Sequence, residues 1–215
     1  MSFVRKLLKQ CRKPNGLFGK MVAQGMNRNH ARMNQWGMSK IPLKEDMIAL
    51  DIGCGGGGNI RWLAIKLKKG MVYGIDYSQE SVNISRKVNA EHIKTGRVII
   101  QSGTVSKLPY EDNFFDLVTA VETHYFWPDL SSDLEEVLRV LKPSGRFMII
   151  GGEYKGGKYD ERNASWVEYG KMTYLTLDEH REVLQKAGFV EVTIHEEYDK
   201  GWLCAVGNKS EGSGK

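Results

Sequence analysis

Residues Met47–Asn59 read MIALDIGCGGGGN, an apolar run that leads through an acidic residue into a turn made almost entirely of glycine. Glycine has no Cβ and adopts positive φ readily, so such a turn lets the backbone approach a ligand closely. Residues Met47–Asp51 are apolar on both sides, as is typical of a buried parallel strand. The stretch therefore predicts a strand that ends in a ligand-binding turn.

The bulk composition is that of a globular α/β domain. The chain has 215 residues, of which 41% are hydrophobic and 27% charged, enough for one domain with a sizeable core. It contains no apolar stretch of transmembrane length and no signal-peptide pattern, so we expect no membrane partner. The three cysteines, Cys11, Cys54 and Cys204, are far apart and show no metal-ligand spacing. This pattern favours a reducing, cytoplasmic setting and no metal site.

The positive charge is concentrated at the N-terminus. Residues 1–44 hold ten of the 31 Lys and Arg residues and no acid, whereas the remainder holds 21 basic and 26 acidic residues. A basic arm on a mildly acidic body could steer toward an anionic substrate, nucleic acid or a membrane surface. A solvated helix face is the simpler interpretation of the same charges.

Strand and helix patterns alternate along the chain after Met47. Helices are expected at Ser2–Arg12, within Leu17–Met38, at Asn59–Lys68 and Gln79–Ala90, from Pro128, and from Thr176 to Ala187. After Met47–Asp51, strands are expected at Met71–Ile75, Val98–Gln101, Phe115–Val121, Arg146–Ile150, Val190–His195 and Trp202–Val206. A turn is expected at Lys142–Gly145, and a long loop or small insertion at Gly151–Leu175.

This alternation predicts a Rossmann-like, doubly wound, seven-stranded and mostly parallel sheet whose last strand is antiparallel. We expect helices on both faces and an N-terminal helical lid. The expected domains are a basic arm or lid at 1–44, a ligand-binding domain at 45–209 with a substrate-side insertion at 152–175, and a flexible tail at 210–215. Ligands of such sheets bind at the carboxyl ends of the strands.

The glycine turn alone leaves two kinds of nucleotide ligand open. Gly53, Gly55 and Gly58 satisfy the pattern G-x-G-x-x-G, and Asp76 follows at about the spacing of a ribose-binding acid. On this motif an NAD(P)-dependent oxidoreductase remains an alternative.

Three further features distinguish between these ligands. Asp51 precedes Gly53, Gly55 and Gly57 in the pattern Asp-x-Gly-x-Gly-x-Gly, Leu108-Pro109-Tyr110 precedes the apolar and acidic run Phe114–Val118, and Leu138–Gly145 reads LRVLKPSG. Together these motifs resemble the class I S-adenosylmethionine (SAM)-dependent methyltransferases, particularly the small-molecule branch near the ubiquinone and menaquinone biosynthesis type. The resemblance covers about Met47–Gly151.

The resemblance implies SAM as the cofactor and a role for each matching residue. The backbone of the glycine turn would lie against the methionine and ribose of SAM, Asp51 would help to position the amino group, and Asp76 would accept both ribose hydroxyls. Thr104 stands where relatives often have Asp, so its adenine contact would lack the usual charge. The cofactor-binding residues so implied are Asp51, Gly53, Cys54, Gly55, Gly57, Asn59, Asp76, Tyr77, Ser78, Gly103, Thr104, Val105 and Glu122.

His124 is the first candidate for a catalytic base, because it lies just beyond the fourth strand and histidine titrates near neutral pH. Glu153 and Tyr154 are further catalytic candidates, with His30 as a weaker one. His30 and Asn34 would share a helix face that looks into the site. An aromatic wall from Tyr125, Phe126, Trp127, Trp36 and Tyr154 would suit a planar or cationic acceptor.

We therefore expect an enzyme that transfers a methyl group from SAM to an oxygen, nitrogen or sulfur of a small molecule. An RNA or protein methyltransferase that uses the basic arm is the alternative within the family. No Asn/Asp-Pro-Pro-Tyr type motif follows the fourth strand, which argues against methylation of nucleic-acid bases or protein glutamine. A catalytically silent partner subunit would not need the glycine turn and Asp76. The acceptor and the oligomeric state do not follow from the sequence.

Overall fold

The computed structural model describes residues 30–212. Seven strands form one sheet in the order β3-β2-β1-β4-β5-β7-β6. Strands β1 to β5 are parallel, and β7 runs antiparallel between β5 and β6, as predicted. The strands are β1 Ile48–Ile52, β2 Met71–Asp76, β3 Val98–Ser102, β4 Phe115–Val121, β5 Leu141–Gly151, β6 Val190–Glu197 and β7 Trp202–Asn208.

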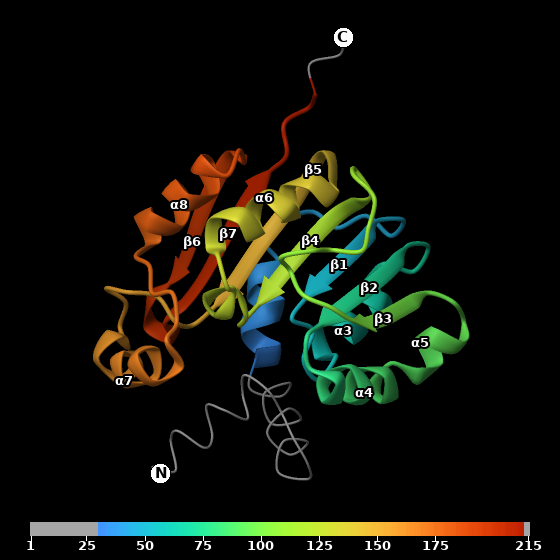
Figure 1. Cartoon of the computed structure of the whole chain (residues 1–215), viewed down its shortest axis with the longest axis horizontal. Coiled ribbons are helices and arrows are strands. Elements are labelled where there is room, and N and C mark those ends of the chain that lie inside the picture. The colour runs from blue at the N-terminus through green and yellow to red at the C-terminus, as the bar shows by residue number, and fades with distance from the viewer. Residues whose placement is uncertain (1–29, 213–215) are drawn as a thin grey trace.

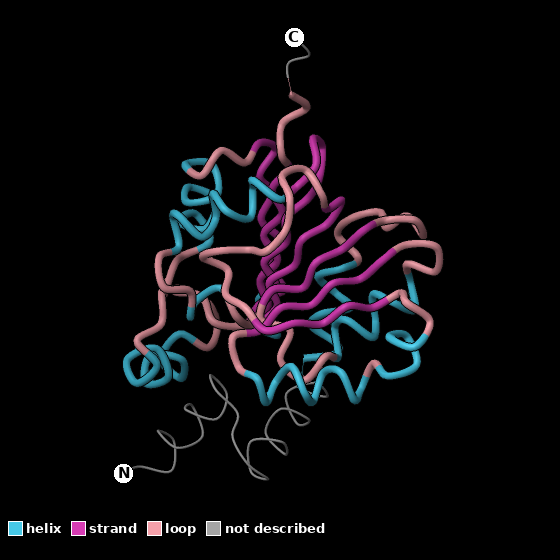
Figure 2. The backbone as a smooth tube through the Cα atoms, turned by 45° about the vertical axis from the view of Figure 1, so that its right-hand side comes forward, coloured by secondary structure: helices cyan, strands magenta, loops and turns pink. Residues whose placement is uncertain are grey.

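Helices cover both faces of this sheet (Figures 1 and 2). They are α3 Gly58–Lys66, α4 Gln79–Val88, α5 Ala90–Lys94, α6 Leu130–Val140, α7 Asp160–Gly170 and α8 Leu177–Lys186, with residues 30–38 also helical and short 3₁₀ helices at His124–Phe126 and Tyr198–Lys200. No helix within residues 30–212 is both long enough and apolar enough to cross a membrane.

Successive side chains of each strand point to opposite faces of the sheet and pack into two hydrophobic cores, one on each face. On β1, Leu50 and Ile52 belong to the core that packs under α6 and α8, while Ala49 belongs to the core under α3, α4 and helix 30–38. This is the two-residue period of a strand buried on both faces. Because both faces are covered, the edge at the carboxyl ends of the parallel strands is where a ligand can reach the backbone.

Side-chain caps fix the starts of two helices. The Ser78 side chain accepts from Ser81 N–H at the start of α4, and Thr176 and Glu179 form a capping box at the start of α8. Helix α4 ends at Val88 rather than Ala90, since Asn89 caps it and starts the separate helix α5.

Two local predictions need correction. Residues Lys142–Gly145 lie inside β5 instead of before it: Leu141 already pairs with Phe115, and the four residues bulge out before Arg146 pairs with Leu117. The segment predicted as a long loop or small insertion at Gly151–Leu175 contains helix α7. Asn163 is its single buried residue, so α7 has no apolar stripe from which a periodicity argument could detect it.

Candidate functional site

The glycine turn between β1 and α3 holds three glycines at positive φ: Gly53 at 68°, Gly55 at 49° and Gly57 at 77°. A Cβ at Gly53 would collide with Thr123, and one at Gly57 with Ser85 and Asn89. A Cβ at Gly55 would meet only the Gly53 carbonyl, at 3.9 Å. Gly53 and Gly57 therefore let the turn pack against protein, whereas the Gly55 backbone faces open space.

That open space is a cleft at the carboxyl ends of the parallel strands, at the lower end of the sheet in Figure 1. The larger cleft, with the solvent at its mouth, has a volume of about 1010 Å³, and is lined by the glycine turn, Asp51, Asp76 and Glu122, with His30 and Asn34 from helix 30–38. A second cleft of about 610 Å³ runs along Gly103–Val105. Both are bounded by Asp76, Tyr77 and Phe126, so they form one continuous binding surface.

Asp76 ends β2 and lies where the two clefts meet. One carboxylate oxygen, Oδ2, accepts from Gly55 N–H at 2.9 Å, and Oδ1 accepts from Ser78 N–H at 2.8 Å. Burial raises the pKa of Asp76, and these backbone bonds oppose that rise. A carboxylate has about four lone-pair sites, so acceptor capacity remains for ligand hydroxyl groups.

Asp51 lies at the floor of the larger cleft, where it is 2% exposed. Its Oδ1 accepts from Asn59 Nδ2 and from the Thr119 hydroxyl, both at 2.7 Å. Burial raises the pKa of Asp51 to about 6, against the effect of these hydrogen bonds. The carboxylate is therefore ionised at neutral pH and makes this end of the cleft attractive to a cation.

Glu122 follows β4 with a φ of 56°, a conformation that residues other than glycine rarely adopt. Its Oε1 accepts from Gly152 N–H at 2.6 Å, and its Oε2 accepts from the Tyr125 hydroxyl at 2.7 Å. Burial and the neighbouring Glu122 raise the pKa of Glu153 well above its ordinary value. The two carboxyl groups thus form an acidic pair of which Glu122 lines the larger cleft.

The sequence of this region matches the family model described as "Methyltransferase domain" over residues 50–149. That match covers β1, the glycine turn, Asp76 and Glu122, which are the parts that build the cleft.

Residues 50–149 form a methyltransferase domain of the class I SAM-dependent type.

Its curated relatives include a demethylmenaquinone methyltransferase of Shouchella clausii, 27% identical over 79% of this chain and 80% of that protein. A sterol 24-C-methyltransferase of Neurospora crassa is 28% identical over 78% of this chain, which spans only 45% of that longer enzyme. A putative methyltransferase of Haloferax volcanii, solved with its Trm112 activator, has the same fold with a TM-score of 0.77 and 23% identity over 91% of this chain and 96% of that one.

The match over residues 50–149 confirms the expected cofactor and reaction class, transfer of a methyl group from SAM to a small molecule. It also replaces the dinucleotide interpretation of the glycine turn, which G-x-G-x-x-G alone had left open. The expectations for residues 1–29, which carry most of the basic arm, lie outside the described residues.

The methyltransferase fold brings most of the predicted cofactor residues to the cleft walls. Gly57 and Ser78 are placed differently, since neither lines the two clefts that the described residues form. Gly57 packs on Ser85 and Asn89, and Ser78 is a buried helix cap, so both support the turn from behind. Cys54 lines the larger cleft although it is only 6% exposed, and burial raises the pKa of its thiol.

His124 is buried beside His180, with their Nε2 atoms 3.1 Å apart. His180 Nδ1 lies 2.7 Å from the Thr176 carbonyl, which can only accept. Neutral His180 therefore donates from Nδ1 and accepts at Nε2, so His124 must donate from Nε2 and keep Nδ1 as an acceptor. Within residues 30–212 that Nδ1 is buried without a partner. Burial lowers the pKa of His124 well below its ordinary value.

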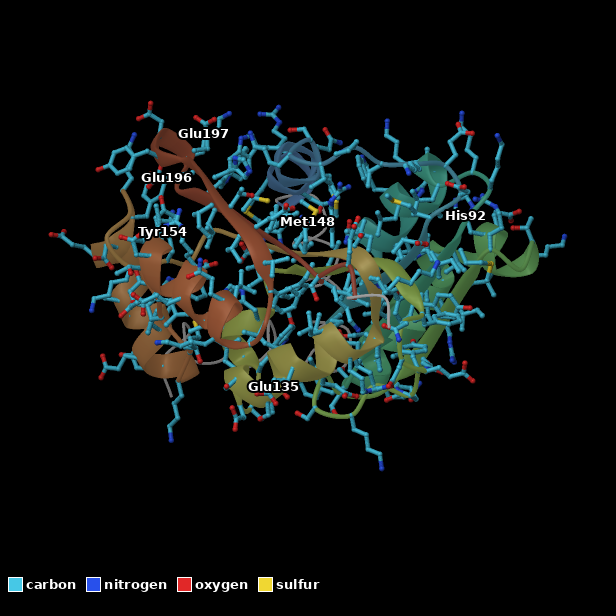
Figure 3. All side chains as sticks on the ribbon, turned by 90° about the horizontal axis from the view of Figure 1, so that it is seen from above. His92, Glu135, Met148, Tyr154, Glu196 and Glu197 are labelled. Atoms are coloured by element: carbon cyan, nitrogen blue, oxygen red, sulfur yellow. The ribbon has the colours of Figure 1, made fainter. Side chains whose placement is uncertain are left out.

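The expected aromatic wall does not assemble among the described residues. Phe126 lines both clefts, but Trp127 belongs to the core, and Trp36 packs on Trp202 with ring centroids 5.9 Å apart. The hydroxyl of Tyr154 donates to Glu196 at 2.8 Å, and the two lie together at the β6 side of the molecule (Figure 3).

Sequence reasoning missed His180 and Thr119. His180 comes from α8, 56 residues after its partner His124, and no local signal connects the two. Thr119 could have been found, because it is the polar residue in the middle of the buried strand FDLVTAV. A fully buried hydroxyl there needs a partner, and Asp51 on the neighbouring strand supplies it.

Gly55→Ala and Gly57→Ala should separate cofactor binding from folding. Each places a Cβ at positive φ, at a cost of about 1–2 kcal/mol in stability. Only Gly55→Ala adds its methyl group to the cleft, so we expect affinity for S-adenosylhomocysteine (SAH) to fall at least about 10-fold in calorimetry. Gly57→Ala should instead lose a further ~1–3 kcal/mol by overpacking against Ser85 and Asn89. Unchanged SAH affinity in Gly55→Ala would contradict this account of the turn.

SAH affinity should also fall as the pH is lowered through about 6, because Asp51 then loses the charge that attracts the ligand ammonium. Stability should respond in the opposite direction. A raised folded pKa favours the protonated fold, so this contribution is complete below the ordinary pKa of 3.8 and is lost as pH rises through about 6. Calorimetry from pH 5 to 8 measures the change in SAH affinity for the wild type and for Asp51→Asn. The change should be smaller in Asp51→Asn. A wild-type affinity that is constant over this range would refute it.

Proposed function

We propose that this methyltransferase modifies a small molecule whose nucleophilic atom lies against Glu122. One observation carries the proposal: the Glu122 carboxylate lies on the wall of the same cleft as the glycine turn, and hydrogen bonds from Gly152 and Tyr125 hold it in place. Glu122 has a positive backbone φ, and both oxygens of its carboxylate accept hydrogen bonds. A residue held in such a strained conformation is typical of functional sites.

The residues of the cleft fit SAM. The backbone at Gly55 offers the close approach that the cofactor needs, Asp76 has acceptor capacity for the ribose hydroxyls, and Asp51 places negative charge at the methionine end. Gly103, Thr104 and Val105, with Tyr77, line the cleft proposed for adenine. When bound, SAM supplies an electrophilic methyl group on its sulfonium. The protein's own task is to hold the acceptor in line with that group and to exclude water.

The acidic pair Glu122 and Glu153 is suited to receive a proton from the acceptor. Burial and the neighbouring Glu122 raise the pKa of Glu153 well above its ordinary value. An acceptor hydroxyl or amine gives up a proton as its new bond to carbon forms, and Glu122 is the carboxylate of this pair that lines the cleft. His124 remains a candidate base through Nδ1, while Tyr154 is engaged with Glu196.

The relatives suggest where to search for the acceptor. Several are named as demethylmenaquinone methyltransferases, and one as a 27-O-demethylrifamycin SV methyltransferase that is 30% identical over 73% of this chain. Hydroxylated aromatic compounds therefore lead the acceptor panel, followed by amines and thiols. An RNA sample in the same panel tests the alternative role of the basic arm.

The test is SAH release by the full chain with each acceptor, followed by Glu122→Gln and His124→Gln. Gln can keep the bond from Gly152 N–H but carries no charge. We expect Glu122→Gln to lower turnover by about 10²-fold or more, a larger loss than the one it causes in SAH affinity. Failure of every small molecule to release SAH, with release by RNA instead, would overturn the proposal. A larger loss in His124→Gln than in Glu122→Gln would assign the base to His124.

A further inference from the structure

Asn34 lies on helix 30–38 and lines the larger cleft, yet its side chain is almost completely buried, with 6% exposed. The helix is seated closely on the sheet. A Cβ at Gly37 would come within 2.6 Å of Ile150 on β5, and Met33 and Met38 are buried in the core below. Because this packing fixes the helix, the position of Asn34 over the cleft is part of the fold.

A chain of hydrogen bonds orients the Asn34 side chain. The Asp51 carboxylate can only accept, so the amide group facing it must be the Nδ2 of Asn59, at 2.7 Å. The Oδ1 of Asn59 is thereby turned away from Asp51, and it accepts from Asn34 Nδ2 at 2.9 Å. The charge on Asp51 thus sets both amides, and it leaves the carbonyl oxygen of Asn34 as the outermost acceptor of the chain.

That carbonyl oxygen is buried and has no hydrogen-bond partner among residues 30–212. Leaving a buried acceptor unpaired is unfavourable, so an acceptor held in this way at a cleft indicates a ligand that donates to it. If the proposed function holds, Asp76 takes the ribose hydroxyls and the Gly103–Val105 side takes the adenine amino group. The donor of the cofactor that is left for this end of the cleft is its α-ammonium group.

We propose that Asn34 is a cofactor-binding residue whose Oδ1 accepts a hydrogen bond from the α-ammonium of SAM. Helix 30–38 is then a wall of the cofactor site. The ammonium is held between the carbonyl dipole of Asn34 and the carboxylate of Asp51, two groups that the Asn59 amide joins. This inference rests on the proposed function.

The test compares SAH with its desamino analogue, which keeps the carboxylate but lacks the ammonium, by calorimetry on the full chain. The variant is Asn34→Leu, which keeps the side-chain size and removes the amide. Arg32→Leu is the matched control, because Arg32 lies on the same helix, is exposed and is not among the residues that line the cleft. Thermal unfolding without ligand checks that each variant folds.

We expect Asn34→Leu to weaken SAH binding about 10- to 100-fold, the range for a hydrogen bond to a charged group, and to change binding of the desamino analogue less than ~3-fold. Arg32→Leu should leave both affinities within ~3-fold of wild type. Equal losses for both ligands, or none, would overturn the role of Asn34. So would a variant that changes the KM of the acceptor and not SAH affinity.

If Asn34→Leu does not fold, the wild type alone still tests the contact between Asn34 and the ammonium. It should bind SAH at least about 10-fold more tightly than the desamino analogue, and equal affinities would refute the ammonium contact. Failure of the wild type to bind SAH at all would instead refute the proposed function, so the two failures are distinguishable.

Discussion

The structure of the site depends on one hydrogen bond, from the backbone N–H of Gly55 to the carboxylate of Asp76. It joins the turn after β1 to the end of β2, two elements that lie side by side in the sheet but are separated in the chain by helix α3. The bond holds the glycine backbone open toward the cleft and points the carboxylate at the same space. Burial makes this arrangement costly for the charge on Asp76, and the two backbone donors reduce that cost.

The two ends of the cleft differ in chemistry because different elements build them. The end near Gly103–Val105 is bounded by the loop after β3, while the opposite end gathers Asp51, Asn34 and Glu122 from β1, helix 30–38 and the residue after β4. Negative charge at that second end suits both the ammonium of the cofactor and an acceptor that loses a proton. A cofactor bound with its sugar on Asp76 would reach both ends, which orients its methyl group toward the acceptor side.

Much of the fold could be predicted from the sequence, since it depends on local patterns. Apolar runs mark the strands, and Ser78 and Thr176 mark helix starts, each through the chemistry of a few adjacent residues. Helix α7 was not predicted because only one of its residues is buried. The bulge in β5 was not predicted because a Pro-Ser-Gly sequence is also a turn signal. The contacts of the side chains around Glu122 could not be predicted from the sequence. The pairing of His124 with His180 and of Glu122 with Gly152 joins residues that only the folded chain brings together.

The most direct measurement is a crystal structure of the full chain with SAH. We expect the ribose hydroxyls to lie on the carboxylate of Asp76, with adenine along Thr104 and Val105 and the amino-acid end against Asp51. An SAH molecule that lies elsewhere, or that makes no contact with Asp76, would contradict the account.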